Sequence, residues 1–308
     1  MLEYFLTVCG QIFSMALMVV VGYIMFKAKM INEVGTKQMS AFLLKVVTPF
    51  ILIAAYQREF DKALFGQWII MFAAALLTYL IHIVIAELIY KKKDSVYAEN
   101  RLSIILPNNG FMAFPILQAL AGETGIFFGS TSVIVLTVLI WSYGVKLMRP
   151  EEKLDIKKIV LNPGIIGVAG GLILFCSPWK LPNSVYTAVN SIGSINTPLA
   201  MIVLGALLAQ TDLKRELKRF CYYKLAFLKL ILLPLIMMVV FAFIPMPQNI
   251  RLVGFICSVT PTATAVSMLS QLYDRDYRYA TNAVVIITVL SAITMPLILS
   301  LGKLVIGY

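Results

Sequence analysis

The segment LPNNGFMAFP, residues 106–115, places two prolines, two amides and a glycine inside an otherwise apolar run. Proline in a helix interior removes one hydrogen bond and clashes with the preceding turn, so a helix here is expected to break near Pro107. A second segment, SVTPTATA at residues 258–265, interrupts another apolar run at Pro261 and adds hydroxyl groups. Both segments are polar islands in apolar surroundings, and those surroundings decide what the islands can do.

The rest of the chain has the composition of a membrane protein. Hydrophobic residues make up 60% of the 308 residues and charged residues 13%, against roughly 45–50% and about 25% in an average soluble domain. The apolar runs are about 20 residues long, which is what a helix needs to cross a bilayer. Because backbone groups in lipid must be satisfied within the segment, the sequence predicts an all-α integral membrane protein.

Ten transmembrane helices are predicted. They lie at residues 5–26, 38–57, 67–90, 99–121, 124–147, 159–177, 191–211, 220–244, 249–271 and 277–301. Of the 26 Lys and Arg residues, 19 fall in one set of alternating loops, 5 fall in the other set with the carboxyl tail, and Lys45 and Lys229 fall inside helices. Because cytoplasmic loops carry the excess of cations, both termini are predicted to lie on the outer side of the cytoplasmic membrane. The first run has its cations after it, so it is interpreted as a retained helix and not as a signal peptide.

The prolines indicate an internal repeat. The second and fourth helices of each half contain a mid-membrane proline: Pro49 and Pro107 in the first half, Pro198 and Pro261 in the second. The longest inner loop, near 147–158, separates two sets of five helices, and an odd number per set inserts the second set in the opposite orientation. The sequence therefore predicts two inverted five-helix repeats, at residues 1–150 and 151–308.

The two broken helices, four and nine, would run in opposite directions, so that the second half of each begins near the midplane. If the breaks cross, the unpaired N–H groups and positive dipole ends of both half-helices converge and favour an anion. The candidate substrate-binding residues in the two segments are Pro107, Asn108, Asn109, Gly110, Thr260, Pro261, Thr262 and Thr264. Two proline kinks stabilised by local hydroxyl groups are the alternative.

Three ionisable side chains fall within the predicted helices. Lys45 could counter an anionic substrate, or its amine could extend to the inner surface. Lys229 is interpreted as extending to the surface in the same way. His82 could relay a proton, and because it is the only histidine, a multi-histidine metal site is excluded. No metal site and no cofactor are predicted.

Other classes of function lack their sequence signatures. Basic residues flank apolar runs and do not line a helix face, which argues against a nucleic-acid partner. The four cysteines have no CxxC spacing and are interpreted as small apolar residues. The chain has no HExxH or GxSxG motif and no intramembrane aspartate pair, so it is not predicted to be an enzyme. A channel or a non-transporting membrane sensor is the alternative to a carrier.

Short motifs in a fixed order extend over nearly all 308 residues. They are Leu106-Pro107-Asn108 with Met112, Pro115 and Leu117, then Asn162-Pro163-Gly164-Ile165-Ile166 with Leu181-Pro182, then Pro261 to Tyr273, and Pro296. In this order the chain resembles the auxin efflux carrier family, which includes plant PIN-type auxin carriers and bacterial permeases for malate or malonate. It lacks the long cytosolic loop of many plant members.

The resemblance implies that broken helices four and nine cross at the substrate site. It also implies a scaffold of helices 1, 2, 6 and 7, a moving unit of helices 3–5 and 8–10, elevator-type alternating access and a homodimer. Asn108 matches the amide that contacts substrate in the plant carriers. Asn109 stands where they have threonine, and Ser132 and Thr137 stand where they tend to have glutamines.

The resemblance leaves the substrate open. The plant carriers have an acidic–basic pair early in helix three, whereas the corresponding stretch here, WIIMF at residues 68–72, is uncharged. An auxin-like carboxylate and a dicarboxylate both remain as substrates, and proton coupling, sodium coupling and facilitated diffusion all remain as mechanisms. The predicted function is secondary transport of a small organic anion across the lipid bilayer of the cell membrane.

Overall fold

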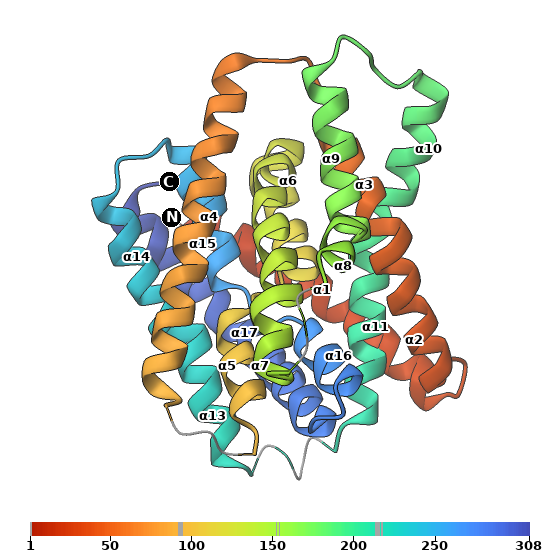
Figure 1. The fold of residues 1–308 in the computed structure, drawn as a ribbon, viewed down its shortest axis with the longest axis vertical. Coiled ribbons are helices and arrows are strands. Elements are labelled where there is room, and N and C mark those ends of the chain that lie inside the picture. Colours follow the sequence, from red (N-terminus) through yellow and green to blue (C-terminus); the bar gives the residue numbers. More distant parts are fainter. Residues whose placement is uncertain (1, 92–94, 152, 154, 213–215, 217) are drawn as a thin grey trace.

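The computed structural model describes residues 2–91, 95–151, 153, 155–212, 216 and 218–308. Over these residues the chain is helical, and its only β-type pairing is one isolated bridge. Many of the helices run along the long axis of the molecule (Figure 1). The prediction of an all-α protein is confirmed for this part of the chain. Four cations of the charge count, Lys92, Lys93, Lys214 and Arg215, lie outside the described residues.

The first half of the chain contains long helices interrupted by π-helical turns, which are labelled η. Its elements are α1 (Leu2–Lys27), α2 (Glu33–Phe42), η1 (Leu43–Val47), α3 (Thr48–Ala55), α4 (Lys62–Ile89), α5 (Tyr97–Ile105), η2 (Asn109–Ala113), α6 (Phe114–Leu139), η3 (Ile140–Gly144) and α7 (Val145–Met148). The α6 stretch bends at Gly122, whose φ of +57° favours glycine. This bend falls between the predicted helices four and five.

The second half has a similar mixture of long and broken helices. Its elements are α8 (Ile156–Val160), α9 (Pro163–Cys176), α10 (Asn183–Ser194), α11 (Asn196–Gln210), α13 (Phe220–Phe227), η4 (Leu228–Leu232), α14 (Leu233–Phe243), α15 (Gln248–Val259), α16 (Ala265–Leu272) and α17 (Tyr277–Ile306). The predicted helix at 191–211 is therefore too short. The helical stretch begins at Asn183, and hydropathy missed α10 because its sequence, NSVYTAVNSIGS, is half polar.

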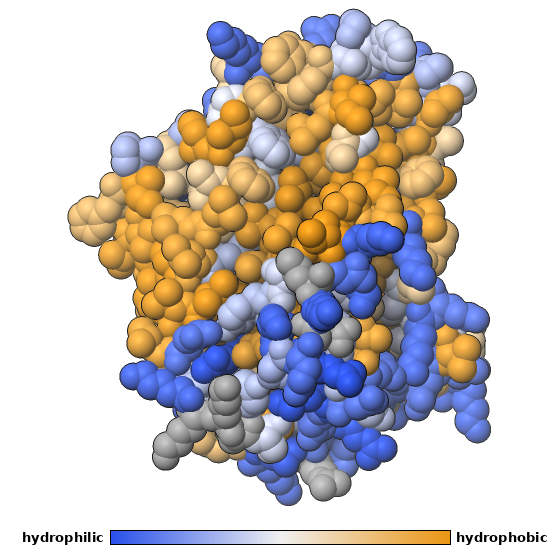
Figure 2. Space-filling view, in the orientation of Figure 1, coloured by the Kyte–Doolittle hydropathy of each residue, from blue (hydrophilic) through white to orange (hydrophobic). Residues whose placement is uncertain are grey.

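Seven stretches of the described chain are long and apolar enough to cross a membrane. They are Phe5–Lys27, Glu33–Ala55, Lys62–Ile89, Asn109–Met148, Asn183–Gln210, Phe220–Phe243 and Tyr277–Ile306. Figure 2 shows an apolar surface over the middle of the molecule, with hydrophilic residues gathered at the lower end, where α5 and α13 lie in Figure 1. An apolar surface of this extent requires lipid around it, which makes the chain a multi-pass membrane protein.

The helices α1 and α11 pack closely because a glycine on each helix faces the backbone of the other helix. A Cβ atom on Gly22 of α1 would overlap the carbonyl of Ile202, and one on Gly205 of α11 would overlap the carbonyl of Val19. Small residues allow such close approach between helices in a membrane. The helix α3 lies against α9 and α10.

The broken helices lie at the core of the molecule. All nine residues of α5 are buried, and so is the end of α15 from Val253 to Val259. The long helices α4, α6 and α17 pack around them. The two breaks are therefore enclosed by other helices, as non-helical backbone at membrane depth requires.

Candidate functional site

The two breaks meet as a short antiparallel pair. The N–H of Asn108 donates to the carbonyl of Pro261 at 2.8 Å, and the N–H of Ala263 donates to the carbonyl of Leu106 at 2.8 Å. Pro107 and Thr262 consequently lie opposite each other. These bonds replace some of the intrahelical bonds that both helices lose at their prolines.

Each break is caused locally by the effect of a proline on the residue before it. Proline pushes the preceding residue away from the helical region. Leu106, before Pro107, has a ψ of 104°, and Thr260, before Pro261, has a ψ of 149°, so both are extended. Helix resumes at Asn109 in one chain segment and at Ala265 in the other.

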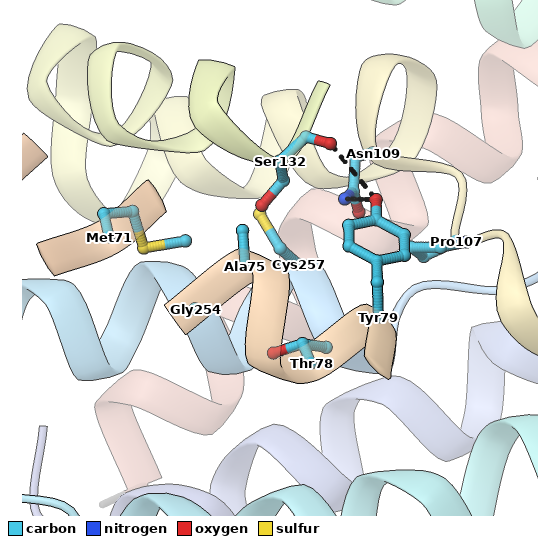
Figure 3. A pocket seen from close by; sticks show the side chains of 9 residues that line it. All are labelled: Met71, Ala75, Thr78, Tyr79, Pro107, Asn109, Ser132, Gly254 and Cys257. Atoms are coloured by element: carbon cyan, nitrogen blue, oxygen red, sulfur yellow. Dashed lines mark hydrogen bonds between the residues drawn. The ribbon is translucent and has the colours of Figure 1, made fainter. Parts of the chain in front are cut away.

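Asn109 lies at the centre of a buried hydrogen-bond chain. Its Oδ1 accepts from Thr260 Oγ1 at 3.0 Å, and its Nδ2 donates to the hydroxyl of Tyr79 at 3.2 Å. The Tyr79 hydroxyl in turn donates to the carbonyl of Ser132 at 3.2 Å. Figure 3 shows the last two bonds from close by. The chain joins both breaks to α4 and α6.

Asn108, the neighbouring amide, is in a different situation. Its side chain is 5% exposed and makes no hydrogen bond to any residue that the structure describes. Gly110 and Thr264 are half-buried near the start of the second half-helices. The first N–H groups of a helix have no partner within it, so this part of the site offers donors to an anion.

A small cavity lies beside the crossing. It is lined by Met71, Ala75, Thr78, Tyr79, Pro107, Asn109, Ser132, Gly254 and Cys257 (Figure 3). None of these side chains is charged. An anion at this place would therefore be held by amides, hydroxyl groups and helix ends.

The structure brings together most of the predicted site residues. Pro107, Asn108, Asn109 and Gly110 meet Thr260, Pro261 and Thr262, with Thr264 two residues further along the chain and Ser132 in the cavity wall. Two predicted residues do not join them. Lys45 is exposed on η1, and Thr137 is buried in α6 beyond Ser132 without lining the cavity.

Several residues at the site were not predicted, and three of them carry polar side-chain groups of interest. Tyr79 and Cys257 line the cavity, and neither belongs to a motif that would have marked it in the sequence. Asn196, which is 1% exposed, donates from Nδ2 to the carbonyl of Gly110 at 3.0 Å, and its Oδ1 has no partner among the described residues. The Asn-Thr-Pro motif at residues 196–198 was a signal that could have drawn attention to it.

The interpretation of Lys229 was wrong. This side chain does not extend to the surface but is 0% exposed, and its Nζ donates to the carbonyl of Ile104 at 2.9 Å. The physical reason is that the broken helix leaves carbonyl groups without intrahelical partners inside the protein. His82 is also 0% exposed.

Two comparisons with known proteins bear on this site. A family model described as membrane transport protein matches residues 7–299. The chain is also 21% identical over 292 residues to an uncharacterized transporter of Methanocaldococcus jannaschii, and this similarity covers 91% of the chain and 94% of the relative. Both matches include the two breaks and the helices that carry them. The chain belongs to the membrane transport protein family, that of the auxin efflux carriers.

Proposed function

We propose that this protein is a secondary transporter that carries a small organic carboxylate across the cytoplasmic membrane by elevator-type alternating access. The observation that carries the proposal is the pairing of two broken helices at Pro107 and Thr262, deep in the protein. Half-helix ends near the midplane are how many secondary transporters bind ions and substrates. The carboxylate would lie against Asn108 and the start of η2.

The architecture that we propose has ten spans in two inverted repeats, residues 1–150 and 151–308. The scaffold would be α1–α3 with α9–α11, and the moving unit α4–α7 with α13–α17. The packing of α1 on α11 and of α3 on α9 and α10 supports the first group, and the packing of α6 on α4 and α15 supports the second. We also propose a homodimer with both termini outside. Figure 1 marks both ends of the chain away from the hydrophilic lower end of Figure 2.

Uptake into proteoliposomes tests the function. Purified protein would first be screened for thermal stabilisation by malonate, malate and indole-3-acetate, since a ligand that binds the folded state raises its stability. We expect saturable uptake of at least one labelled carboxylate and its exchange against unlabelled substrate inside. Uptake without saturation or exchange would instead indicate a channel, and no uptake of any of them would overturn the proposal.

The change Asn108→Ala tests the site. We expect it to reduce uptake at least tenfold, because the loss of a hydrogen bond to a charged group costs about 1.5–3 kcal/mol. Asn190→Ala is the matched control, since Asn190 is exposed on α10, and it should behave like wild type. Wild-type uptake by a well-folded Asn108→Ala variant would show that the carboxylate binds elsewhere.

A further inference from the structure

The carboxyl end of the half-helix α5 is surrounded by polar groups from other parts of the chain. The last four carbonyl groups of a helix have no partner within it. Here each lies near a donor from elsewhere: Ser103 O accepts from Thr262 Oγ1 at 2.7 Å, Ile104 O from Lys229 Nζ at 2.9 Å and Leu106 O from Ala263 N at 2.8 Å, while Ile105 O lies 3.4 Å from His82 Nδ1. Two of these four groups, Lys229 and His82, can gain or lose a proton.

Both titratable groups are enclosed by the protein. Lys229 and His82 are 0% exposed, and Nε2 of His82 has no hydrogen-bond partner among the described residues. Lys229 lies on the π-helical turn η4, and His82 lies on α4. The carboxyl end of a helix carries partial negative charge, so it favours a cation at this place.

No carboxylate in the described part of the chain accompanies Lys229. The turn η4 packs against α5, α13, α14 and α17. The titratable and charged residues of these helices are Tyr97, Glu99 and Arg101 on α5, Cys221, Tyr222, Tyr223 and Lys224 on α13, none on α14, and Tyr277, Arg278, Tyr279 and Lys303 on α17. The helix α4 carries Lys62, Tyr79 and Glu87 in addition to His82, and two further helices packed on it carry Glu123 (α6) and Arg251 and Cys257 (α15).

Glu99 and Glu87, the carboxylates of α5 and α4, have other partners. Glu99 lies about 7.5 Å along the axis of α5 from Ile104, and its Oε1 is 3.6 Å from Nε of Arg275. Glu87 accepts from the hydroxyl of Tyr143 at 2.7 Å and pairs with Arg101 at 3.4 Å. Neither therefore neutralises a charge on Lys229.

The charge balance at the carboxyl end of α5 depends on which ligand is bound where the two breaks cross. A buried cation without an anionic partner is unfavourable, and a helix end supplies only part of the compensation. The side chains of Lys229 and His82 lie at neighbouring carbonyl groups, and positive charges on both side chains would repel each other. The two side chains together therefore hold at most one excess proton. A carboxylate bound at the crossing would supply the missing negative charge.

We propose that Lys229 and His82 form the binding site of a proton that is carried together with the substrate anion. The neutral amine of Lys229 takes up one proton from the side on which the carboxylate binds, and the ammonium returns it to water on the other side. Each of the two ligands then raises the affinity for the other, as linkage requires. This inference rests on the proposed transport of a carboxylate.

The surrounding geometry provides the connection between the two sites. Thr262, whose hydroxyl donates to the carbonyl of Ser103, is one of the two residues that pair where the breaks cross. Tyr79 lines the cavity, and its ring lies edge-on to that of His82 with 6.4 Å between the centroids. His82 thus lies next to the cavity wall. Both titratable residues belong to the proposed moving unit, so that the proton would travel with the substrate.

Uptake of labelled malonate or malate, whichever the wild-type protein takes up faster, tests the inference in vesicles loaded with the pH dye pyranine. We expect an acidic exterior to accelerate uptake by at least about fivefold, and the substrate to acidify the vesicle interior as it enters. In Lys229→Gln, whose amide cannot take up a proton, stimulation by the proton gradient and acidification should be lost at whatever rate of exchange remains. Lys45→Gln, a change at an exposed lysine in another π-helical turn, should retain both.

The outcomes separate the two proposals. Failure of the wild-type protein to exchange any labelled carboxylate would overturn the transport function and this inference with it. Exchange that ignores the proton gradient and leaves pyranine unchanged would overturn the inference alone. So would gradient-stimulated uptake by Lys229→Gln. If that variant does not fold, Lys229→Arg, which cannot release its proton, should show uptake that no longer responds to the gradient, and the pyranine signal of the wild type decides independently of any variant.

Discussion

At the scale of single residues, the two adjacent amides at the break have separate tasks. Asn109 is bound on both sides, by Thr260 and by Tyr79, and so holds the two breaks and α4 together. Asn108 has no such partner in the described structure and is available to a ligand. A buried network of this kind is stabilising only while every member is satisfied.

The hydroxyl of Tyr79 provides a test of that network. We expect Tyr79→Phe to lower the free energy of unfolding by about 1–3 kcal/mol, because it leaves Nδ2 of Asn109 without an acceptor in a buried place. Unfolding in detergent measures the change. Tyr23→Phe is the control, since Tyr23 is 37% exposed on α1, and an equal loss in both variants would contradict the assigned role.

At the scale of the helices, proline has two different consequences. Three of the four π-helical turns end two residues before a proline: η1 before Pro49, η2 before Pro115 and η4 before Pro234. In these helices the backbone widens and continues. At Pro107 and Pro261 the helix stops, because the extended residues there find partners in each other's segment.

The packing of α1 on α11 can be tested through two glycines of the same helix. Gly22→Ala should destabilise the protein by about 1–3 kcal/mol, because the added methyl group overlaps the backbone of Ile202. Gly10→Ala introduces a methyl group with nothing within 4 Å and should be neutral or stabilising by up to about 1 kcal/mol. Thermal unfolding of both variants in one detergent provides the comparison, and equal midpoints would contradict the close approach.

At the scale of the whole molecule, an elevator requires one group of helices to slide past the other. Asn196 of α11 and Gly110 of η2 lie on the two sides of that boundary and share a hydrogen bond of 3.0 Å. In contrast, Asn249 of α15 and Gln67 of α4 share a bond of 2.7 Å within the proposed moving unit. Under the proposed mechanism only the first contact has to break during transport.

Crosslinking tests this difference in an active background from which the four native cysteines have been removed. Cysteines at positions 196 and 110, bridged by mercuric ion, should abolish uptake, and dithiothreitol should restore it. Cysteines at positions 249 and 67, bridged in the same way, should leave uptake unchanged. Undiminished uptake by the first bridged pair would exclude relative movement of these two groups.

Local composition was sufficient to predict the membrane class, the positions of most spans and the two proline breaks. This is because the bilayer acts on each segment separately, through its own hydropathy and charge. It also drew attention to Asn108 and Asn109, since polar groups are rare in such segments, and their role in binding a substrate stays a prediction.

Only the tertiary structure decided which groups bind the free carbonyl groups at the breaks. Lys229 lies 125 residues from the carbonyl that it caps, and Thr262 lies 159 residues from its own. A broken helix leaves its carbonyl groups unpaired, but the sequence does not say which distant donor reaches them. For the same reason Lys229 resembled a surface lysine until the fold placed an acceptor beside it, because burial of a charge depends on partners that only packing brings within reach.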